Sequence, residues 1–184
     1  MKRRRCLRLL LWCAALATGV VAAPAHAQRE APESSVKAAF LYKFANYIEW
    51  PPNAFAAPSA PLVIGVAGAE EIATDLERIT PGRNVAGRAV VVRRVRGGDA
   101  LRGLHVLFIG RNEAAMAALI RAAREQAILT VTESDTGLDK GSAINFVTAG
   151  ERVGFEVSLD AAEKSGHRIS SRMLAVAKRV VPKS

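Results

Sequence analysis

Two histidines are the first residues to test for chemistry, because imidazole can act as a general base or bind a metal ion. His105 lies inside the apolar run Leu104–Gly110, and His167 follows Gly166. The GxSxG sequence that often presents a nucleophilic serine is absent from the chain. We expect His105 to be a satisfied or edge histidine in a buried strand and His167 to be exposed. No catalytic residue is predicted.

An acidic loop at residues 132–142 is the second candidate for chemistry. Its side chains Glu133, Asp135 and Asp139 could form a carboxylate pair or bind calcium. The loop lacks the alternating acidic ligands of an EF-hand, however, and its glycines suit a surface turn. We expect a solvated loop, no metal and no cofactor. The nucleotide-binding motifs GxxxxGK[ST] and GxGxxG are also absent.

Tyr47 and Trp50 could contact a ligand, and both lie near the end of the segment Ser34–Pro52. Apolar residues recur in this segment at the spacing of one helical face, and Ser34 or Ser35 is expected to cap the helix. The helix should end near Trp50, because two prolines follow it. The predicted apolar stripe is Val36, Phe40, Leu41, Phe44, Tyr47 and Ile48, and the predicted polar face is Lys37, Lys43, Asn46 and Glu49. A core position is the simpler interpretation of Tyr47 and Trp50, and a ligand contact is the alternative.

The first 27 residues have the three parts of a secretory signal peptide. Five basic residues precede the apolar run Leu9–Ala23, and Ala25-His26-Ala27 fits the small-x-small cleavage rule. The apolar run is short for a membrane span. We predict cleavage after Ala27, a polar tail at 28–33 and one domain at 34–184, exported to a bacterial periplasm.

Removal of this leader changes what the composition implies. The leader holds five basic and no acidic residues, so the formal net charge falls from +9 to +4. Strong affinity for nucleic acid therefore loses its main support. Both cysteines, Cys6 and Cys13, leave with the leader, so the remaining chain has no thiol and no disulfide. Its 157 residues are enough for one hydrophobic core.

Alternating strands and helices are predicted through the middle of the chain. Apolar, β-rich runs predict strands at 62–66, 88–95, 104–110 and 127–131. Amphipathic segments predict helices at 69–80 and 112–126, the second capped by Asn112. This alternation is typical of a mainly parallel sheet between two layers of helices. Four arginines close the second strand, Arg93, Arg94, Arg96 and Arg102, and they are either a solvated strand end or a surface for an acidic partner.

The last third of the chain differs from the middle. Residues 143–158 predict an antiparallel hairpin that turns at 149–151. Helices are predicted at 159–166 and at 169–181, the second capped by Ser170 or Ser171. We therefore expect a single three-layer α/β domain. It should have a mixed, mostly parallel sheet, helices on both faces and an antiparallel C-terminal hairpin.

Two stretches of the sequence resemble the YfiR family of small periplasmic regulators of a membrane-bound diguanylate cyclase. The first is VKAAFLYKFANYIEWP, from Val36 to Pro51. The second is GSAINFV…ERVGFEVSLDAAEKSGHRISSRMLAVA, from Gly141 to Ala177. Both agree with the family in type and order, and the resemblance covers nearly all of the chain from Val36 onward.

The resemblance implies a binding protein that is not an enzyme. Such proteins dock on the periplasmic sensor domain of an inner-membrane diguanylate cyclase and lower cyclic di-GMP synthesis. A peptidoglycan-associated outer-membrane lipoprotein sequesters them, and biofilm output then rises. The late motif of the family maps onto Arg152, Val153, Phe155, Glu156, Gly166, Ile169 and Ser170. Ser158 replaces a frequent asparagine, and His167 replaces a frequent aliphatic residue.

From this motif we expect partner contacts at Arg152, Phe155, Glu156, His167, Ile169 and Ser170. Phe155 and Ile169 would be apolar anchors, with charged residues at their rim. Both could equally be core residues, and the core is the simpler interpretation.

Three functions stay open from the sequence. The first is a regulator that binds a cyclase or another membrane sensor, such as a histidine kinase. The second is a small-molecule sensor with Tyr47 and Trp50 in its pocket. The third is a hydrolase that uses His105 or His167. A homodimer is also left open.

Overall fold

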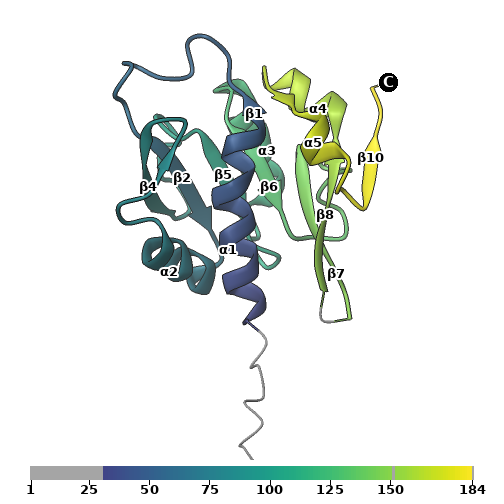
Figure 1. Cartoon of the computed structure of the whole chain (residues 1–184). Helices are drawn as coiled ribbons and strands as arrows, with labels where there is room; N and C mark the ends of the chain where they lie inside the picture. Colours follow the sequence, from purple (N-terminus) through teal and green to yellow (C-terminus); the bar gives the residue numbers. More distant parts are fainter. Residues whose placement is uncertain (1–30, 151, 184) are drawn as a thin grey trace, which may run out of the picture. The chain divides into compact units, whose positions relative to one another are not determined.

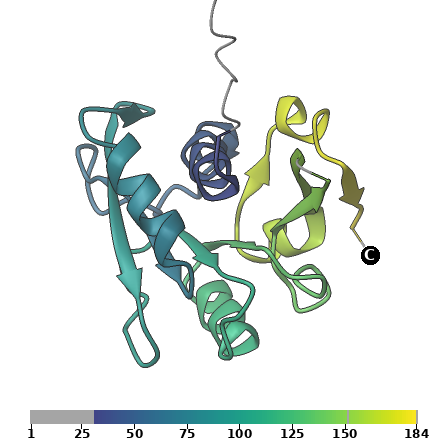
Figure 2. The ribbon, with the colours of Figure 1, turned by 90° about the horizontal axis from the view of Figure 1, so that it is seen from below.

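Eight strands form a curled, mostly parallel sheet in the computed structural model, which describes residues 31–150 and 152–183 (Figures 1 and 2). Their order across the sheet is β10-β8-β7-β6-β5-β2-β4-β3. The β7–β8 and β3–β4 pairs are antiparallel, and the other pairs are parallel. The strands are β2 (Leu62–Ala67), β3 (Asn84–Val85), β4 (Arg88–Val95), β5 (Val106–Ile109), β6 (Leu129–Thr132), β7 (Ile144–Ala149), β8 (Arg152–Ser158) and β10 (Arg179–Val181).

Helices cover both faces of this sheet, so the predicted three-layer α/β fold is confirmed. The longer helices are α1 (Glu33–Phe44), α2 (Glu70–Ile79) and α3 (Met116–Glu125). One buried cluster joins α1 and α2 to one face, and a second joins α3 to the other. The shorter helices are η1 (Ala45–Tyr47), α4 (Leu159–Lys164) and α5 (Ser171–Leu174). The predicted signal peptide at 1–27 and residues 28–30 of the predicted tail lie outside the described residues.

The central strands are buried on both faces, as their apolar sequences predict. Every residue of β5 and β6 is buried. Alternate side chains of β5 point to opposite faces, so Phe108 joins the α1 cluster and Leu107 the α3 cluster. This alternation explains why these strands read as continuous apolar runs.

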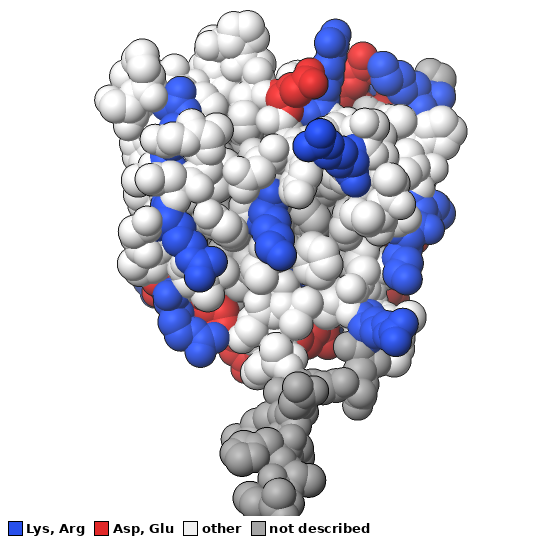
Figure 3. Space-filling view, in the orientation of Figure 1, with Lys and Arg blue, Asp and Glu red and all other residues white. Residues whose placement is uncertain are grey.

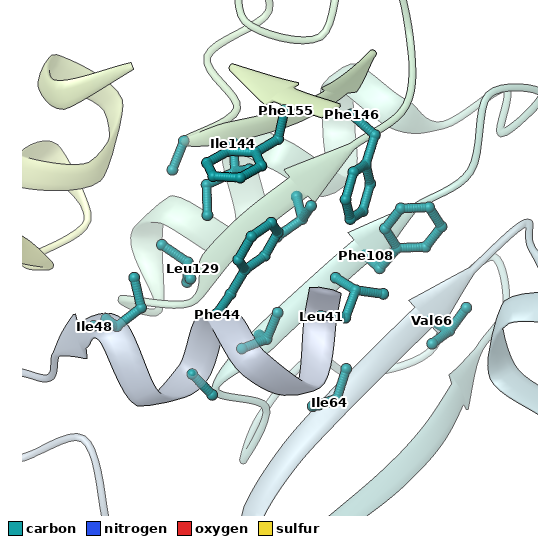
Figure 4. Close-up of a cluster of buried hydrophobic side chains, with 14 of the residues drawn as sticks. Leu41, Phe44, Ile48, Ile64, Val66, Phe108, Leu129, Ile144, Phe146 and Phe155 are labelled. Atoms are coloured by element: carbon teal, nitrogen blue, oxygen red, sulfur yellow. The ribbon is translucent and has the colours of Figure 1, made fainter. Parts of the chain in front are cut away.

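Helix α1 lies in the hollow of the curled sheet and supplies the centre of the larger core (Figures 2 and 4). Leu41 and Phe44 are almost fully buried. The Phe44 ring packs edge-on against Phe155 of β8, with 4.8 Å between ring centroids, and stacks on Phe146 of β7 at 5.6 Å. These contacts bind the first helix to the β7–β8 hairpin, as the predicted aromatic face requires.

The ends of α1 differ from the sequence prediction. The helix gives way to η1 after Phe44 and then to the short strand β1 (Ile48–Glu49), well before Trp50. Pairing of β1 with β9 (Arg168–Ile169) competes with further helix in a stretch where Ile48 is β-branched. Ser34 and Ser35 do not cap the helix. Their hydroxyls instead donate to Oδ2 of Asp75 in α2, each at 2.8 Å.

The polar and apolar faces of α1 also differ at two positions. Lys37 was expected on the polar face, yet only 4% of it is exposed. Tyr47 was expected in the apolar stripe, yet it is 40% exposed. The turn from α-helix to η1 changes the residue spacing, which rotates Tyr47 away from the stripe.

The predicted final helix at 169–181 is wrong. Only one turn of α5 forms, and Arg179–Val181 become β10, which pairs in parallel with β8. The backbone N–H of Lys178 donates to the carbonyl of Phe155 at 2.8 Å and begins this pairing. The β-branched residues Val180 and Val181 favour a strand once an open sheet edge is available.

The start of α3 was assigned to the wrong residue, whereas α4 begins at Leu159 as predicted. Asn112 does not cap α3, which begins at Met116. Glu113 accepts a hydrogen bond from the N–H of Ala115 at 3.0 Å, one residue before the helix. The hydroxyl of Ser158 caps α4 by accepting from the N–H of Ala161 at 3.2 Å.

Replacement of Phe44 tests the role of this aromatic core. Phe44→Ala should lower the free energy of unfolding by about 3–5 kcal/mol, because the ring contacts two strands in a closed site. Urea titration followed by circular dichroism measures the loss. Tyr47→Ala, three residues later and partly exposed, is the control and should cost far less. Equal losses would contradict the assignment of Phe44 as the centre of the core.

Candidate functional site

The pairing of β1 with β9 brings the two sequence motifs together. Ile48 lies opposite Ile169, and Glu49 lies opposite Arg168. The N–H of Ser170 donates to the carbonyl of Tyr47 at 2.9 Å. The structure therefore places Tyr47, Ile169 and Ser170 side by side, although they come from opposite ends of the chain.

Trp50 continues this junction into a cluster of aromatic and imidazole rings. Its indole meets the His167 ring edge-on, with 5.2 Å between ring centroids, and lies 6.2 Å from the His105 ring. Phe55 stacks on His105 at 4.4 Å. The Arg88 guanidinium lies 3.8 Å above the Phe55 ring, a cation–π distance. Trp50 is thus half-buried among rings and contributes to packing.

His167 is buried, so its predicted exposure is wrong. Only 1% of the residue is accessible. Gly166 takes a left-handed turn at φ 80° after α4, and the N–H of His167 donates back to the Ala162 carbonyl at 2.9 Å. This turn directs the ring inward, where its Nδ1 lies 3.1 Å from the Ser165 hydroxyl.

The other ring nitrogen of His167, Nε2, is buried and has no hydrogen-bond partner among the described residues. Burial without a compensating charge lowers the pKa of His167 to about 4. The imidazole is therefore neutral at physiological pH.

His105 is the satisfied, buried histidine that the sequence predicts. Its Nδ1 accepts a hydrogen bond from the N–H of Val63 at 3.1 Å. Burial lowers its pKa, and the nearby Arg88 charge acts in the same direction. In residues 31–150 and 152–183, no cluster of three or more His, Asp or Glu side chains could hold a metal ion.

A cavity of about 350 Å³ lies beside His167, between α4, β9 and α5. Its apolar lining comes from Leu159, Ala162, Ile169 and Leu174. Glu163, Arg168 and Lys183 supply charge, and the Lys183 ammonium lies 2.7 Å from the Glu163 carboxylate. We call these seven residues and His167 the α4–α5 pocket. An apolar group with one polar atom would fit its chemistry.

The other predicted partner residues lie on β8 and are not in this pocket. Phe155 is 2% exposed and belongs to the core, which confirms the simpler interpretation of its role. The Glu156 carboxylate accepts two hydrogen bonds from the Arg179 guanidinium, both 2.9 Å, and this pairing raises the pKa of Arg179. Arg152 is exposed at the start of β8, whereas α4 follows its end. The predicted patch therefore divides into two regions.

The sequence did not reveal the ion pairs that Lys37 forms. Its buried ammonium contacts the Glu33 carboxylate and lies 2.5 Å from the Glu133 carboxylate. Hydrogen bonding to Lys37 is the main reason why the pKa of Glu33 is lowered. The predicted solvated loop is therefore correct for Asp135 and Asp139, which are exposed, and wrong for Glu133. The i,i+4 spacing of Glu33 and Lys37 was the available signal.

Two of the four clustered arginines near the end of β4 are neutralised or hydrogen-bonded within the chain. Arg94 pairs with Glu70 and Glu77, and both carboxylates raise its pKa. The Arg93 guanidinium donates to the carbonyls of Ala100 and Arg102. These contacts leave Arg93 and Arg94 little freedom to bind an acidic partner.

The fold and these sites define a mixed α/β protein with a junction of rings and an adjoining apolar pocket. The chain belongs to the YfiR/HmsC-like family, whose model matches residues 34–178. The resemblance seen in the sequence is thereby confirmed. The family is periplasmic and regulatory rather than catalytic, so the chain is, in general terms, a YfiR-like regulator.

A solved structure shares the fold. It is the crystal structure of a conserved domain protein from Vibrio cholerae O1 biovar El Tor str. N16961, with a TM-score of 0.50 and 13% sequence identity. The match covers 80% of this chain and 60% of that one. A comparison with curated proteins finds no match. Within the described residues, no helix has the length and apolar character needed to cross a bilayer.

The buried His167 should make stability depend on pH. Its pKa is about 4 in the folded chain and near 6.5 when unfolded, so only the unfolded chain binds the proton between these values. The contribution of the neutral His167 ring to the free energy of unfolding is therefore complete above pH 6.5. About 3 kcal/mol should be lost as the pH falls to 4.

Two measurements check this prediction. Urea titrations of the wild type and of His167→Gln should differ least at pH 4, because the variant lacks the titrating group. Proton NMR of the histidine rings should give a midpoint near pH 4 for His167. A midpoint near 6.5 would contradict the buried, neutral imidazole.

Proposed function

We propose that this chain is a periplasmic regulator that binds the periplasmic sensor domain of an inner-membrane diguanylate cyclase and lowers cyclic di-GMP synthesis. The observation that carries the proposal is the YfiR/HmsC-like family match across residues 34–178. The predicted signal peptide supports export. A junction of two distant motifs beside an apolar pocket supports a binding role.

Repression by docking requires the protein to bind the inactive state of the cyclase more tightly than the active state. A protein that binds both states equally does not change the equilibrium between them, however tightly it binds. A preformed surface meets this requirement if only one arrangement of the sensor domain fits it. The β1–β9 pair and α4 would hold the proposed surface in place.

The α4–α5 pocket is the proposed contact region. Ile169 and Ser170, two of the predicted partner residues, lie in it or at its edge. An apolar partner side chain could enter the pocket while Arg168 meets a carboxylate at the rim. Arg152 and Glu156 would form a separate polar contact along β8. Phe155 and His167 act in this proposal by positioning, because both are buried.

The resemblance also supplies a release step. A peptidoglycan-associated outer-membrane lipoprotein would compete for the protein and thereby free the cyclase, so that biofilm formation increases. A homodimer of the regulator is compatible with either partner.

A small-molecule sensor is the second candidate, and one observation favours it. The unpartnered Nε2 of His167 lies in a residue that lines the α4–α5 pocket, and a ligand with a hydrogen-bond donor could satisfy it. Trp50 packs on the same imidazole, whereas Tyr47 stands at the exposed edge. Such a ligand could also set the affinity for the cyclase.

Reconstitution with the cyclase tests the proposal. The chain without its leader, residues 28–184, should bind the detergent-solubilised, full-length diguanylate cyclase of its own host and reduce its cyclic di-GMP output. Ile169→Asp should weaken inhibition about tenfold or more, because a charge would enter the apolar pocket. Val91→Asp, at an exposed β-branched residue on β4 away from the pocket, is the control and should inhibit like the wild type.

The outcomes separate function from site. If the wild type neither binds nor inhibits the cyclase, the proposed function is wrong. If Ile169→Asp inhibits as well as Val91→Asp, the pocket is not the contact region. A rise in thermal stability with a small metabolite, and no cyclase binding, would favour the sensor.

A further inference from the structure

The segment that follows Ala177 is weakly held to the rest of the sheet. Among the described residues, Ala177 is the last one that packs against the larger core cluster. The three residues of β10 then pair with β8, whereas β7 pairs with β8 over six residues. Figure 1 shows β10 at the outer edge of the sheet. An edge strand with so few contacts opens more easily than the strands that enclose the core.

The side chains of β10 add little buried surface to this pairing. Arg179 is exposed and Val180 is 37% exposed, so only Val181 is half-buried. Arg179 is held by its ion pair with Glu156, in which the arginine side chain remains 57% exposed. Ion pairs at the surface contribute little to stability, because water and salt screen their charges. Local opening of this segment therefore costs far less free energy than unfolding of the chain.

The same segment continues to the α4–α5 pocket. Pro182 has no N–H to donate, and the pairing of β10 with β8 ends just before it. Lys183 lines the pocket, and its ammonium lies 2.7 Å from the Glu163 carboxylate of α4. Basic and acidic side chains lie together at the upper right of Figure 3, where Figure 1 shows α4 and the end of β10. We call residues 179–183 the strap.

Protection of a sheet edge does not by itself explain the course of the strap. β10 occupies the edge of β8 that faces away from β7, and covering such an edge prevents unwanted strand pairing. The strap extends past β10, however, and reaches α4 through Lys183. It also lies beyond the residues that the family model matches, which are 34–178. Neither edge protection nor the family match therefore accounts for its contact with the pocket.

We propose that the strap is an autoinhibitory cover, which closes the mouth of the α4–α5 pocket and must open before the partner docks there. The proposal rests on the proposed function for its partner, the cyclase. The side chains of Lys183 and Glu163 are 57% and 56% exposed, so this ion pair stands on the solvent side of the pocket. An apolar group that enters past the pair would strip water from two charges, which is unfavourable. Glu163 is fixed on α4, so the weakly held strap is the side that moves.

A cover of this kind lowers the apparent affinity for the partner. If the partner binds only the open form, its apparent Kd equals the intrinsic Kd divided by the open fraction. A strap that is open in about one molecule in ten would thus weaken binding about tenfold. Changes that free the strap should recover this factor, and a covalent bond that holds it closed should prevent docking.

Two matched variants free the strap or leave it closed. Arg179→Gln with Lys183→Gln removes both ion pairs of the strap and leaves Glu156 and the other pocket residues unchanged. The control is Arg78→Gln with Arg94→Gln, which removes the same charge from ion pairs on α2 and β4. Thermal unfolding confirms that both variants fold.

Thiol labelling of the pocket tests the cover without the cyclase. Ala162→Cys places a small thiol in the pocket lining, and residues 28–184 hold no other cysteine. Iodoacetamide should label this thiol about five to ten times faster in the freed variant than in the wild-type background, because the rate follows the open fraction. The control variant should label like the wild-type background.

A disulfide that holds the strap closed tests the docking step. Glu156 and Arg179 lie opposite each other in the register, and their side chains bond, so they point to the same side. Neighbouring strands are about 4.8 Å apart, which is within the Cα range of a disulfide. Glu156→Cys with Arg179→Cys should therefore close the strap when oxidised, and the reduced form of the same protein is its control.

Inhibition of the solubilised, full-length cyclase is the second measurement. The oxidised protein should be needed at about tenfold or more the concentration of the reduced protein for the same inhibition. The freed variant should inhibit at about one tenth of the wild-type concentration, and the control variant at the wild-type concentration.

The outcomes separate the strap from the proposed function. If the freed and control variants label at the same rate, the strap does not cover the pocket and the proposal is wrong. If the oxidised and reduced forms inhibit equally, or the freed variant inhibits less than the wild type, the autoinhibitory role is wrong. If the wild type does not inhibit the cyclase, the proposed function and the docking step both fail, whereas faster labelling of the freed variant would still support the cover.

Discussion

The contact between Phe44 and the β7–β8 hairpin is the constraint on which the rest of the structure depends. A flat sheet would leave one side of α1 without partners, but the sheet curls until Phe146 and Phe155 reach the helix (Figure 4). Polar contacts fix the same helix elsewhere, through Lys37 to Glu133 and through Ser35 to Asp75. Together these contacts hold the helix from its first turn to its last.

The sequence predicts the sheet well because its strands are decided by local patterns. The run at β5 is apolar at every position, and it can be satisfied only by burial on both faces. The hairpin is likewise local, since Gly150 turns the chain at φ 60° between two strands with β-rich sequences. Such features need no knowledge of distant residues.

The errors occur where a distant segment outweighs a local preference. Val180 and Val181 follow a helical pattern, yet the free edge of β8 makes a strand the better state. His167 follows a glycine that usually marks a surface turn, yet that turn aims the ring at Trp50. Lys37 looks like a surface lysine until Glu133, almost a hundred residues away, is placed beside it. Each error needed a contact that no local window contains.

These long-range contacts also change how the family motif is interpreted. A motif residue can be specific to a family because it touches a partner or because it holds a neighbour that does. Phe155 is buried in the core, whereas Ile169 and Ser170 stand next to accessible surface. The site itself could therefore be predicted only in part, because sequence spacing does not separate contact from support.

The position of α1 in the chain has a consequence for the order of folding. The helix emerges near the start of the domain, but its aromatic partners come more than a hundred residues later. Native contacts between such distant residues carry a large loop-closure cost, so they form late and slow the search for the native state. A chain that is threaded through a membrane pore from its N-terminus could thus not complete the aromatic packing of its first helix until almost the whole sequence had passed. Delayed compaction of this kind is compatible with passage through a narrow channel, because a folded domain cannot enter one.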